Sequence, residues 1–466
     1  MEKSIIKKGS KEIIVFVVLF IMMFAASSLF AQHQIGHTQI TFTDPARGNR
    51  AIQTEIYYPA NTTGDDVSMV AGQYPVIVFG HGFVMAWDAY ENLWESYVPR
   101  GYIMMFPRTE GNMLSTNHQE FGWDLQFLVG AIQAENTKPS SIFFNGVAPE
   151  TALMGHSMGG GASFLAADSL VTNGNTNLKT LIGYAPAEST TNGVSSINSA
   201  LSITVPAVIF SGSNDGVTPA VDHHTPMYNN LASSCKTFVN VLGGGHCYFA
   251  NSNTNCDFGE STSSTGISIT REEQQDVAQD LTNLWLDYML KGDCDAFDYF
   301  QDSLANSTRI SHLQACAVNP TPAIIDNGAS LTSSQTGVSY QWFLNGNPIP
   351  SSNSVTIPIT TNGDYVVEVL FANGCPKTSA PYTVTGVGIE RYEFNNFNVY
   401  PNPTKGLLNI KGANLKGKNV QIFSVVGQVV VDLTLEGETT LDLNNIQEGV
   451  YFIKINGIIK RVVLTK

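Results

Sequence analysis

The segment that most constrains the fold is a short apolar run that ends in a glycine-flanked serine. Residues 152–154 are apolar, a Gly-His-Ser-Met-Gly run around Ser157 follows, and helical spacing starts at Met158. This order predicts a strand, a tight turn and a helix, which is the context of a G-x-S-x-G nucleophile elbow. A Cβ at Gly155 or Gly159 would crowd so tight a turn. Alone, the motif could also be an ordinary glycine-rich turn.

Two later segments supply an acid and a base in the order that such a serine requires. Residues 205–210 form an apolar run that leads to Asp215, and residues 238–242 form another that leads through three glycines to His246. Each lies just past a predicted strand end, where open α/β sheets place their chemistry. We predict Ser157 as nucleophile, His246 as general base and then acid, and Asp215 as the orienter of His246. Singly, Asp215 could be a turn residue and His246 a surface histidine.

An earlier strand offers the second donor of an oxyanion hole. Residues 74–79 are apolar and lead into a Gly-His-Gly-Phe run that ends at Phe83. We predict that the backbone N–H groups of Phe83 and Met158 hold the oxyanion, the latter at a helix N-terminus. The Phe83 ring would then line the substrate cleft, with a buried loop aromatic as the alternative.

The chain around these motifs alternates strands with helices, which predicts a mostly parallel sheet with flanking helices. Residues 35–58 have the alternation of two strands around a turn at 44–49, and we expect them to form an antiparallel edge of the sheet. Apolar spacing predicts helices at 120–136 and 272–291.

Other titratable residues have weaker signals. Asp222, His223 and His224 could pass for a metal site, but they would not face one point on a regular element, so we predict no metal. We expect His156 to pack and to form hydrogen bonds, and not to act as a second base. Glu188 is expected at the surface. No cofactor is predicted.

The first 31 residues predict an export signal. Four lysines precede an apolar run at 13–26, and small residues follow up to Ala31. The run is short for a membrane span, so we predict a signal peptide cleaved after Ala31, with a membrane anchor as the alternative. The formal net charge of −15 argues against nucleic acid or an anionic membrane as a partner.

Six cysteines suit the oxidising environment of an exported protein. No pair has the C-x-x-C spacing of a zinc site. Sequence leaves the disulfide pairing open. We favour Cys247–Cys256, which would staple the loop of His246, and Cys294–Cys316, which would hold the end of the catalytic domain.

The serine elbow, the acid segment at 215–219 and the Gly-Gly-Gly-His base resemble those of α/β-hydrolases of the bacterial cutinase and polyester-hydrolase group. The resemblance covers about residues 34–316. It implies carboxylic-ester hydrolysis without a metal in a shallow cleft, and a disulfide near the end of the domain. Polyester hydrolases carry an aromatic-clamping tryptophan where residues 184–188 here have none, which leaves aromatic polyesters open as substrates.

Composition changes after Cys316. Residues 319–322 read as a linker, and short strands separated by turns predict a small β-sandwich around Trp342 that resembles immunoglobulin-like modules. Its role is open between a spacer and a binder of a surface or polymer. A Tyr-Pro-Asn-Pro opening at 400–403 and a Gly-Val-Tyr-Phe ending resemble the C-terminal sorting domain of the Bacteroidetes type IX secretion system, which implies export across the outer membrane.

We therefore predict an α/β-hydrolase fold followed by two small all-β sandwiches. The expected parts are a signal peptide at 1–31, a catalytic domain at 32–316, an immunoglobulin-like domain at 317–386 and a sorting domain at 390–466. The predicted function is that of a secreted, monomeric serine carboxylic-ester hydrolase, cutinase- or polyesterase-like, that meets an ester substrate and the type IX machinery. The alternatives are a short-chain lipase or esterase without polymer activity, a serine peptidase or thioesterase, and a polymer- or surface-binding protein with a vestigial hydrolase domain. Release and surface attachment both stay open.

Overall fold

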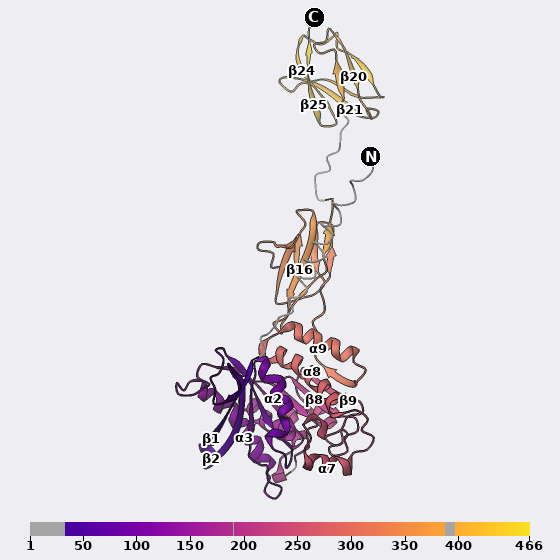
Figure 1. Cartoon of the computed structure of the whole chain (residues 1–466). Coiled ribbons are helices and arrows are strands. Elements are labelled where there is room, and N and C mark those ends of the chain that lie inside the picture. The colour runs from indigo at the N-terminus through magenta and orange to yellow at the C-terminus, as the bar shows by residue number, and fades with distance from the viewer. Residues whose placement is uncertain (1–32, 190, 387–396) are drawn as a thin grey trace, which may run out of the picture. The chain divides into compact units, whose positions relative to one another are not determined.

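The computed structural model describes residues 33–189, 191–386 and 397–466 (Figure 1). The predicted signal peptide at 1–31 lies outside these residues. The chain divides into two compact units between Pro320 and Thr321, which are described separately. No helix within the described ranges is long and apolar enough to cross a membrane.

The first unit is built on a ten-stranded mixed sheet with the order β10-β9-β8-β7-β6-β4-β5-β2-β1-β3. The strands are β1 (Gln34–Asp44), β2 (Arg50–Ala60), β3 (Gly64–Asp65), β4 (Tyr74–Gly80), β5 (Ile103–Pro107), β6 (Val147–His156), β7 (Leu178–Tyr184), β8 (Ala207–Gly212), β9 (Lys236–Val241) and β10 (Ile310–Ala315). The central strands β5-β4-β6-β7-β8-β9 are parallel. The β1–β2 hairpin is antiparallel, as its alternation predicted.

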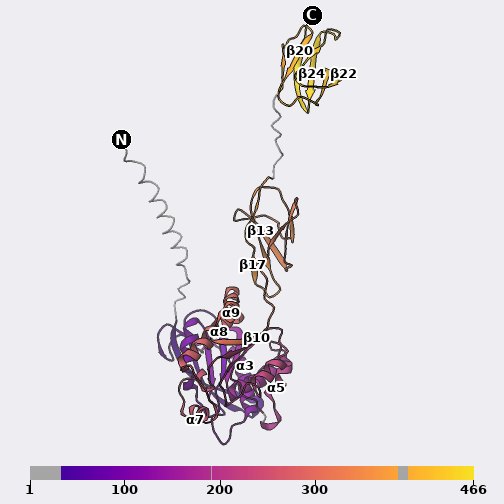
Figure 2. The ribbon, with the colours of Figure 1, turned by 90° about the vertical axis from the view of Figure 1, so that its right-hand side faces the viewer.

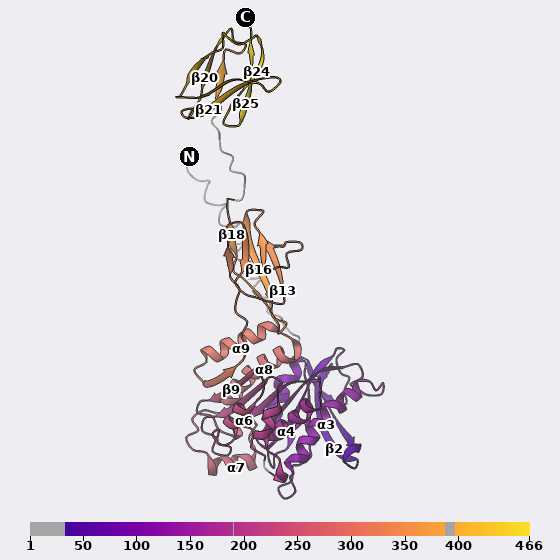
Figure 3. The same ribbon diagram turned by 180° about the vertical axis from the view of Figure 1, so that it is seen from behind.

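Helices cover both faces of this sheet. They are α2 (Glu91–Tyr97), α3 (His118–Asn136), α4 (Met158–Thr172), α5 (Ser196–Ser199), α6 (His224–Asn230), α7 (Thr254–Ser263), α8 (Arg271–Lys291) and α9 (Cys294–Asn306). The buried side chains of α3 and α4 share one core with the sheet, and those of α2, α8 and α9 share the other. Figure 3 shows the α3 and α4 side, and Figure 1 the opposite side. The predicted α/β fold is confirmed.

The edge strand β10 corrects one predicted disulfide. β10 runs antiparallel to β9 and places Ala315 opposite Lys236, so the next residues outward, Cys316 and Cys235, face each other. These two cysteines are bonded, with an S–S distance of 2.07 Å. The predicted Cys294–Cys316 pair is therefore wrong. Cys247 and Cys256 form a second bond.

The second unit contains two groups of short antiparallel strands (Figure 2). The first group comprises β11 (Ile324–Asp326), β12 (Ser330–Ser333), β13 (Ser339–Leu344), β14 (Asn347–Pro348), β15 (Thr356–Pro358), β16 (Gly363–Leu370), β17 (Pro376–Thr378) and β18 (Tyr382–Val384). Its core includes the fully buried Trp342, as predicted. The exact limits of the two predicted domains stay a prediction.

The second group comprises β19 (Asn398–Tyr400), β20 (Leu407–Lys411), β21 (Asn419–Ser424), β22 (Val429–Thr434), β23 (Thr439–Asp442), β24 (Gly449–Ile455) and β25 (Ile458–Leu464). It has a separate apolar core that includes Leu408, Val420 and Ile453. The described residues after Pro320, at 321–386 and 397–466, are therefore all-β, as their composition predicted.

Candidate active site

Ser157 occupies the turn between β6 and α4. Its φ of 54° and ψ of −121° lie in a region that side-chain-bearing residues rarely adopt. The neighbouring glycines make this turn possible. A Cβ on Gly155 would lie 2.3 Å from the carbonyl oxygen of Gly159, and one on Gly159 would lie 2.1 Å from the carbonyl of Gly80. The turn therefore has the geometry of a strained strand-to-helix elbow.

The structure brings the three predicted catalytic residues together. Ser157 Oγ lies 2.9 Å from His246 Nε2, and His246 Nδ1 lies 2.8 Å from Asp215 Oδ2. The carboxylate can only accept, so Nδ1–H donates to Asp215 and leaves Nε2 to accept the serine proton. Asp215 and His246 are buried, whereas Ser157 is partly exposed. A substrate can thus reach the serine while its two partners stay shielded from water.

Asp215 is held in its ionised form. Burial alone would raise its pKa, but the charge and hydrogen bond of His246, with a backbone hydrogen bond from Thr218, lower it to about 2. The Oδ1 atom accepts the N–H groups of Val217 at 2.9 Å and Thr218 at 2.7 Å. The Oδ2 atom also accepts the Thr218 hydroxyl at 2.9 Å. The carboxylate is therefore fixed in position as well as in charge.

A second buried histidine, His224, supports this carboxylate through Thr218, a role that its position in the sequence does not indicate. His224 Nε2 lies 3.1 Å from Thr218 Oγ1, and His224 Nδ1 lies 2.9 Å from Ser211 Oγ. Burial lowers the pKa of His224 to about 3, so the ring is neutral. The single Thr218 proton goes to the charged Asp215, which makes His224 the donor to Thr218 and Ser211 the donor to His224.

His223 and His224, which the sequence offered as possible metal ligands, have different hydrogen-bond partners. His223 Nδ1 instead accepts the N–H of Glu188 at 2.8 Å, while His224 Nε2 lies 3.1 Å from Thr218 Oγ1. Within the described chain, no group of three or more such ligands is arranged to hold a metal. Glu188, expected at the surface, is half-buried, and its carboxylate accepts the Ser195 hydroxyl and the Ile197 N–H.

The two predicted oxyanion donors lie in different elements: Phe83 is in the loop after β4, and Met158 is the first residue of α4. In the described part of the chain, the backbone N–H groups of Phe83 and Met158 donate to no protein acceptor. The N–H of the preceding Gly82 is instead taken by the Tyr90 hydroxyl at 2.8 Å. The Phe83 ring is 45% exposed, which is contrary to a buried loop aromatic. Both predicted amides are thus available to a ligand.

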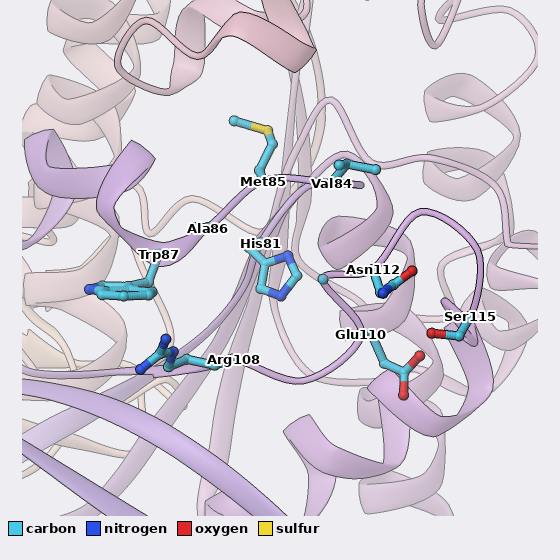
Figure 4. Close-up of a pocket in the computed structure, with 10 residues that line it drawn as sticks. His81, Val84, Met85, Ala86, Trp87, Arg108, Glu110, Asn112 and Ser115 are labelled. Carbon is cyan, nitrogen blue, oxygen red and sulfur yellow. The ribbon is translucent and has the colours of Figure 1, made fainter.

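A depression of about 500 Å³ opens beside the loop that carries Phe83 (Figure 4). The guanidinium of Arg108 lies over the Trp87 ring at 4.3 Å, and Glu110 lies across the depression from this pair. Both charges are already balanced, because Arg108 pairs with Glu55 at 3.0 Å and Glu110 with Arg50 at 2.7 Å. Ser157 does not line this depression.

Comparison with known families places this geometry in context. Residues 32–268, which include the serine, the acid and the histidine, match the model of the PET hydrolase-like family. The chain belongs to the PET hydrolase-like family. This membership makes it a hydrolase of the esterase type and confirms the predicted resemblance.

The C-terminal strands have their own match. Residues 398–465 match the secretion system C-terminal sorting domain, which confirms the second predicted resemblance. This PET hydrolase-like protein is thus marked for export, with the type IX secretion machinery as a partner. No curated protein matches the chain.

Proposed function

We propose that this protein is a secreted serine carboxylic-ester hydrolase that works through an acyl-enzyme. The observation that carries the proposal is the contact of Ser157 Oγ with His246 Nε2, whose other nitrogen binds Asp215. Ser157 attacks the ester carbonyl as His246 takes its proton, and the N–H groups of Phe83 and Met158 receive the oxyanion. His246 then returns the proton to the leaving alcohol. Water activated by His246 cleaves the acyl-enzyme and releases the acid.

Polyesters, including poly(ethylene terephthalate), are the proposed substrates, on the strength of the family match. One observation favours a second candidate, an esterase of aliphatic or soluble esters. The Ala187 N–H donates to the Ser157 carbonyl at 2.8 Å, which places Ala187 next to the nucleophile. Ala187 lies in the stretch 184–188, where the sequence resemblance predicts an aromatic-clamping tryptophan and the chain has none. This wall therefore lacks the tryptophan ring that would stack on an aromatic acid.

The test compares the full chain with Ser157→Ala on p-nitrophenyl esters from acetate to palmitate. Terephthalate diester oligomers and an aliphatic polyester film are tested in parallel. We expect ester turnover that Ser157→Ala abolishes without loss of fold. Turnover of the film but not of the aromatic oligomers would select the second candidate. Equal turnover by both proteins, or cleavage of amides or thioesters in place of esters, would overturn the proposal.

We also propose the roles of the other parts. The leader at 1–31 directs export, the sorting domain is removed at the outer membrane, and the 317–386 domain acts as a spacer for a monomeric catalytic domain at 32–316. The isolated apolar cores of the two all-β groups support their division into separate domains.

A further inference from the structure

A buried chain of hydrogen bonds joins two loops and the end of β6 around the nucleophile. The Gly82 N–H donates to Tyr90 Oη at 2.8 Å, Tyr90 Oη lies 2.9 Å from His156 Nδ1, and His156 Nε2 lies 3.0 Å from the His246 carbonyl. Gly82 belongs to the oxyanion loop, His156 directly precedes the nucleophile Ser157, and His246 is the catalytic base. Tyr90 and His156 are fully buried.

The proton positions in this chain follow from the chemistry of its members. Burial, and then repulsion from His246, lower the pKa of His156 to about 3, so its ring is neutral and has a single N–H. The His246 carbonyl can only accept, so that N–H lies on Nε2. His156 Nδ1 is then an acceptor, and Tyr90 must donate to it.

Tyr90 has no second proton to give. Its hydroxyl also lies 3.3 Å from Met85 Sδ, but an imidazole nitrogen is the stronger acceptor. Burial raises the pKa of Tyr90 far above its usual range, so it keeps the proton. The chain therefore runs in one direction, from the Gly82 amide through Tyr90 and His156 to the His246 carbonyl.

We propose that Tyr90 and His156 are positioning residues that set the oxyanion loop against the loop of the catalytic base. This inference rests on the proposed ester-hydrolase function. By occupying the Gly82 N–H, Tyr90 leaves the next amide, that of Phe83, as the donor for the oxyanion. By holding the His246 carbonyl, His156 fixes the backbone from which the base reaches Ser157 Oγ.

The same contacts could serve stability alone, so the test needs a matched control. Tyr97 provides one. It is the last residue of α2, the helix that begins directly after Tyr90, and it is also fully buried. Its hydroxyl lies 2.9 Å from Tyr184 Oη and takes no part in the chain from Gly82 to His246. Tyr97→Phe thus removes a buried hydroxyl without breaking that chain.

The experiment compares wild type, Tyr90→Phe and Tyr97→Phe in the full chain. We expect Tyr90→Phe to lower kcat between about tenfold and a hundredfold with little change in KM, because small misplacements of catalytic groups cost rates of this order. Tyr97→Phe should lower Tm about as much as Tyr90→Phe does, but it should keep the kcat of the wild type. Equal kcat values for the two variants would overturn the positioning role.

Hydrogen exchange provides a readout that needs no turnover. We expect Tyr90→Phe to speed amide deuteration in residues 80–85 and also in 245–250, and Tyr97→Phe to speed neither. A change confined to 80–85 would show that the chain does not hold the base loop and would overturn the proposal. If the wild type cleaves no ester, the proposed function fails, while the exchange data still decide whether Tyr90 couples the loops.

Discussion

At the residue scale, the carboxylate of Asp215 links the site to the pH dependence of stability. Its pKa is lowered from 3.8 to about 2 in the folded protein. A carboxyl group with a lowered folded-state pKa stabilises the fold above its unfolded pKa, and this contribution is lost as the pH falls through the folded value. The relevant window therefore runs from about pH 4 down to pH 2.

We predict that Asp215→Asn removes this pH-dependent term. Between pH 5 and pH 2, the free energy of unfolding of the wild type should fall by about 2 kcal/mol more than that of the variant. Urea unfolding at both pH values measures the difference. Parallel pH profiles for the two proteins would contradict the ionised, hydrogen-bonded state of Asp215.

The Thr218 hydroxyl offers a prediction on activity. Thr218→Val keeps the shape of the side chain but removes the hydrogen bond to Asp215 Oδ2, so we expect kcat/KM to fall about tenfold. Thr218→Ser keeps the hydroxyl and should restore most of the rate. Ester kinetics on the two variants check this. A valine variant as active as the serine variant would show that the hydroxyl does not support the triad.

The order of serine, acid and histidine just past strand ends made it predictable that Ser157, Asp215 and His246 would lie together. Their supporting residues were not predictable, because Tyr90 and His224 act across the fold. Tyr90 and His156 form a hydrogen bond although they are 66 positions apart in the sequence, and His224 and Ser211 form one although they are 13 apart. Neither spacing matches a helix or strand period. Thr218, three residues after Asp215, had the only local signal, since such spacing suits a turn closed by a carboxylate.

At the element scale, the two disulfides of the catalytic unit hold different structures. Cys247–Cys256 closes a loop of 9 positions directly after His246, and Cys235–Cys316 closes one of 81 positions between β9 and β10. Chain entropy gives about 2.6 kcal/mol for the short loop and about 4.5 kcal/mol for the long one. The bond nearer the chemistry is therefore the one expected to stabilise less.

We predict crossed effects when each pair is replaced by serine. The Cys235/Cys316 double variant should lose more Tm but keep kcat, since its bond lies at the sheet edge. The Cys247/Cys256 double variant should lose less Tm but have lower kcat, because the loop of the base is released. Thermal unfolding and ester kinetics measure both. Loss of kcat in the first variant alone would contradict this division.

The strand β10 shows why the disulfide pairing could not be predicted. It does not alternate between buried and exposed residues, because Ile310 is its only buried residue and the next three residues are exposed. An edge strand of this kind has no period-two signal. Near the other edge, β1 alternates between buried and more exposed residues, and its hairpin with β2 was predicted with its turn.

At the scale of the whole molecule, export and catalysis belong to separate stretches of chain. The family matches fall on residues 32–268 and 398–465. The change of composition after Cys316 was enough to predict the transition from α/β to all-β structure. The function of the β-rich segment at 317–386 could not be predicted, because its apolar core around Trp342 shows that the segment folds but does not indicate what it binds.

We predict that removal of residues 397–466 blocks passage across the outer membrane but leaves ester turnover intact. Expression in a host with type IX secretion, followed by fractionation and activity assay, measures both. The truncated protein should remain in the periplasm and be active in lysates. Its appearance in the medium at wild-type levels would contradict the role of the sorting domain.

The most direct test of the central claim is to trap the acyl-enzyme analogue. Incubation of the full chain with a p-nitrophenyl phosphonate, followed by intact and peptide mass spectrometry, measures how many groups attach and where. We predict one group per chain, on Ser157, with none on Ser157→Ala. A label on any other residue, or no label on a protein that still cleaves esters, would contradict the account of Ser157 as the nucleophile.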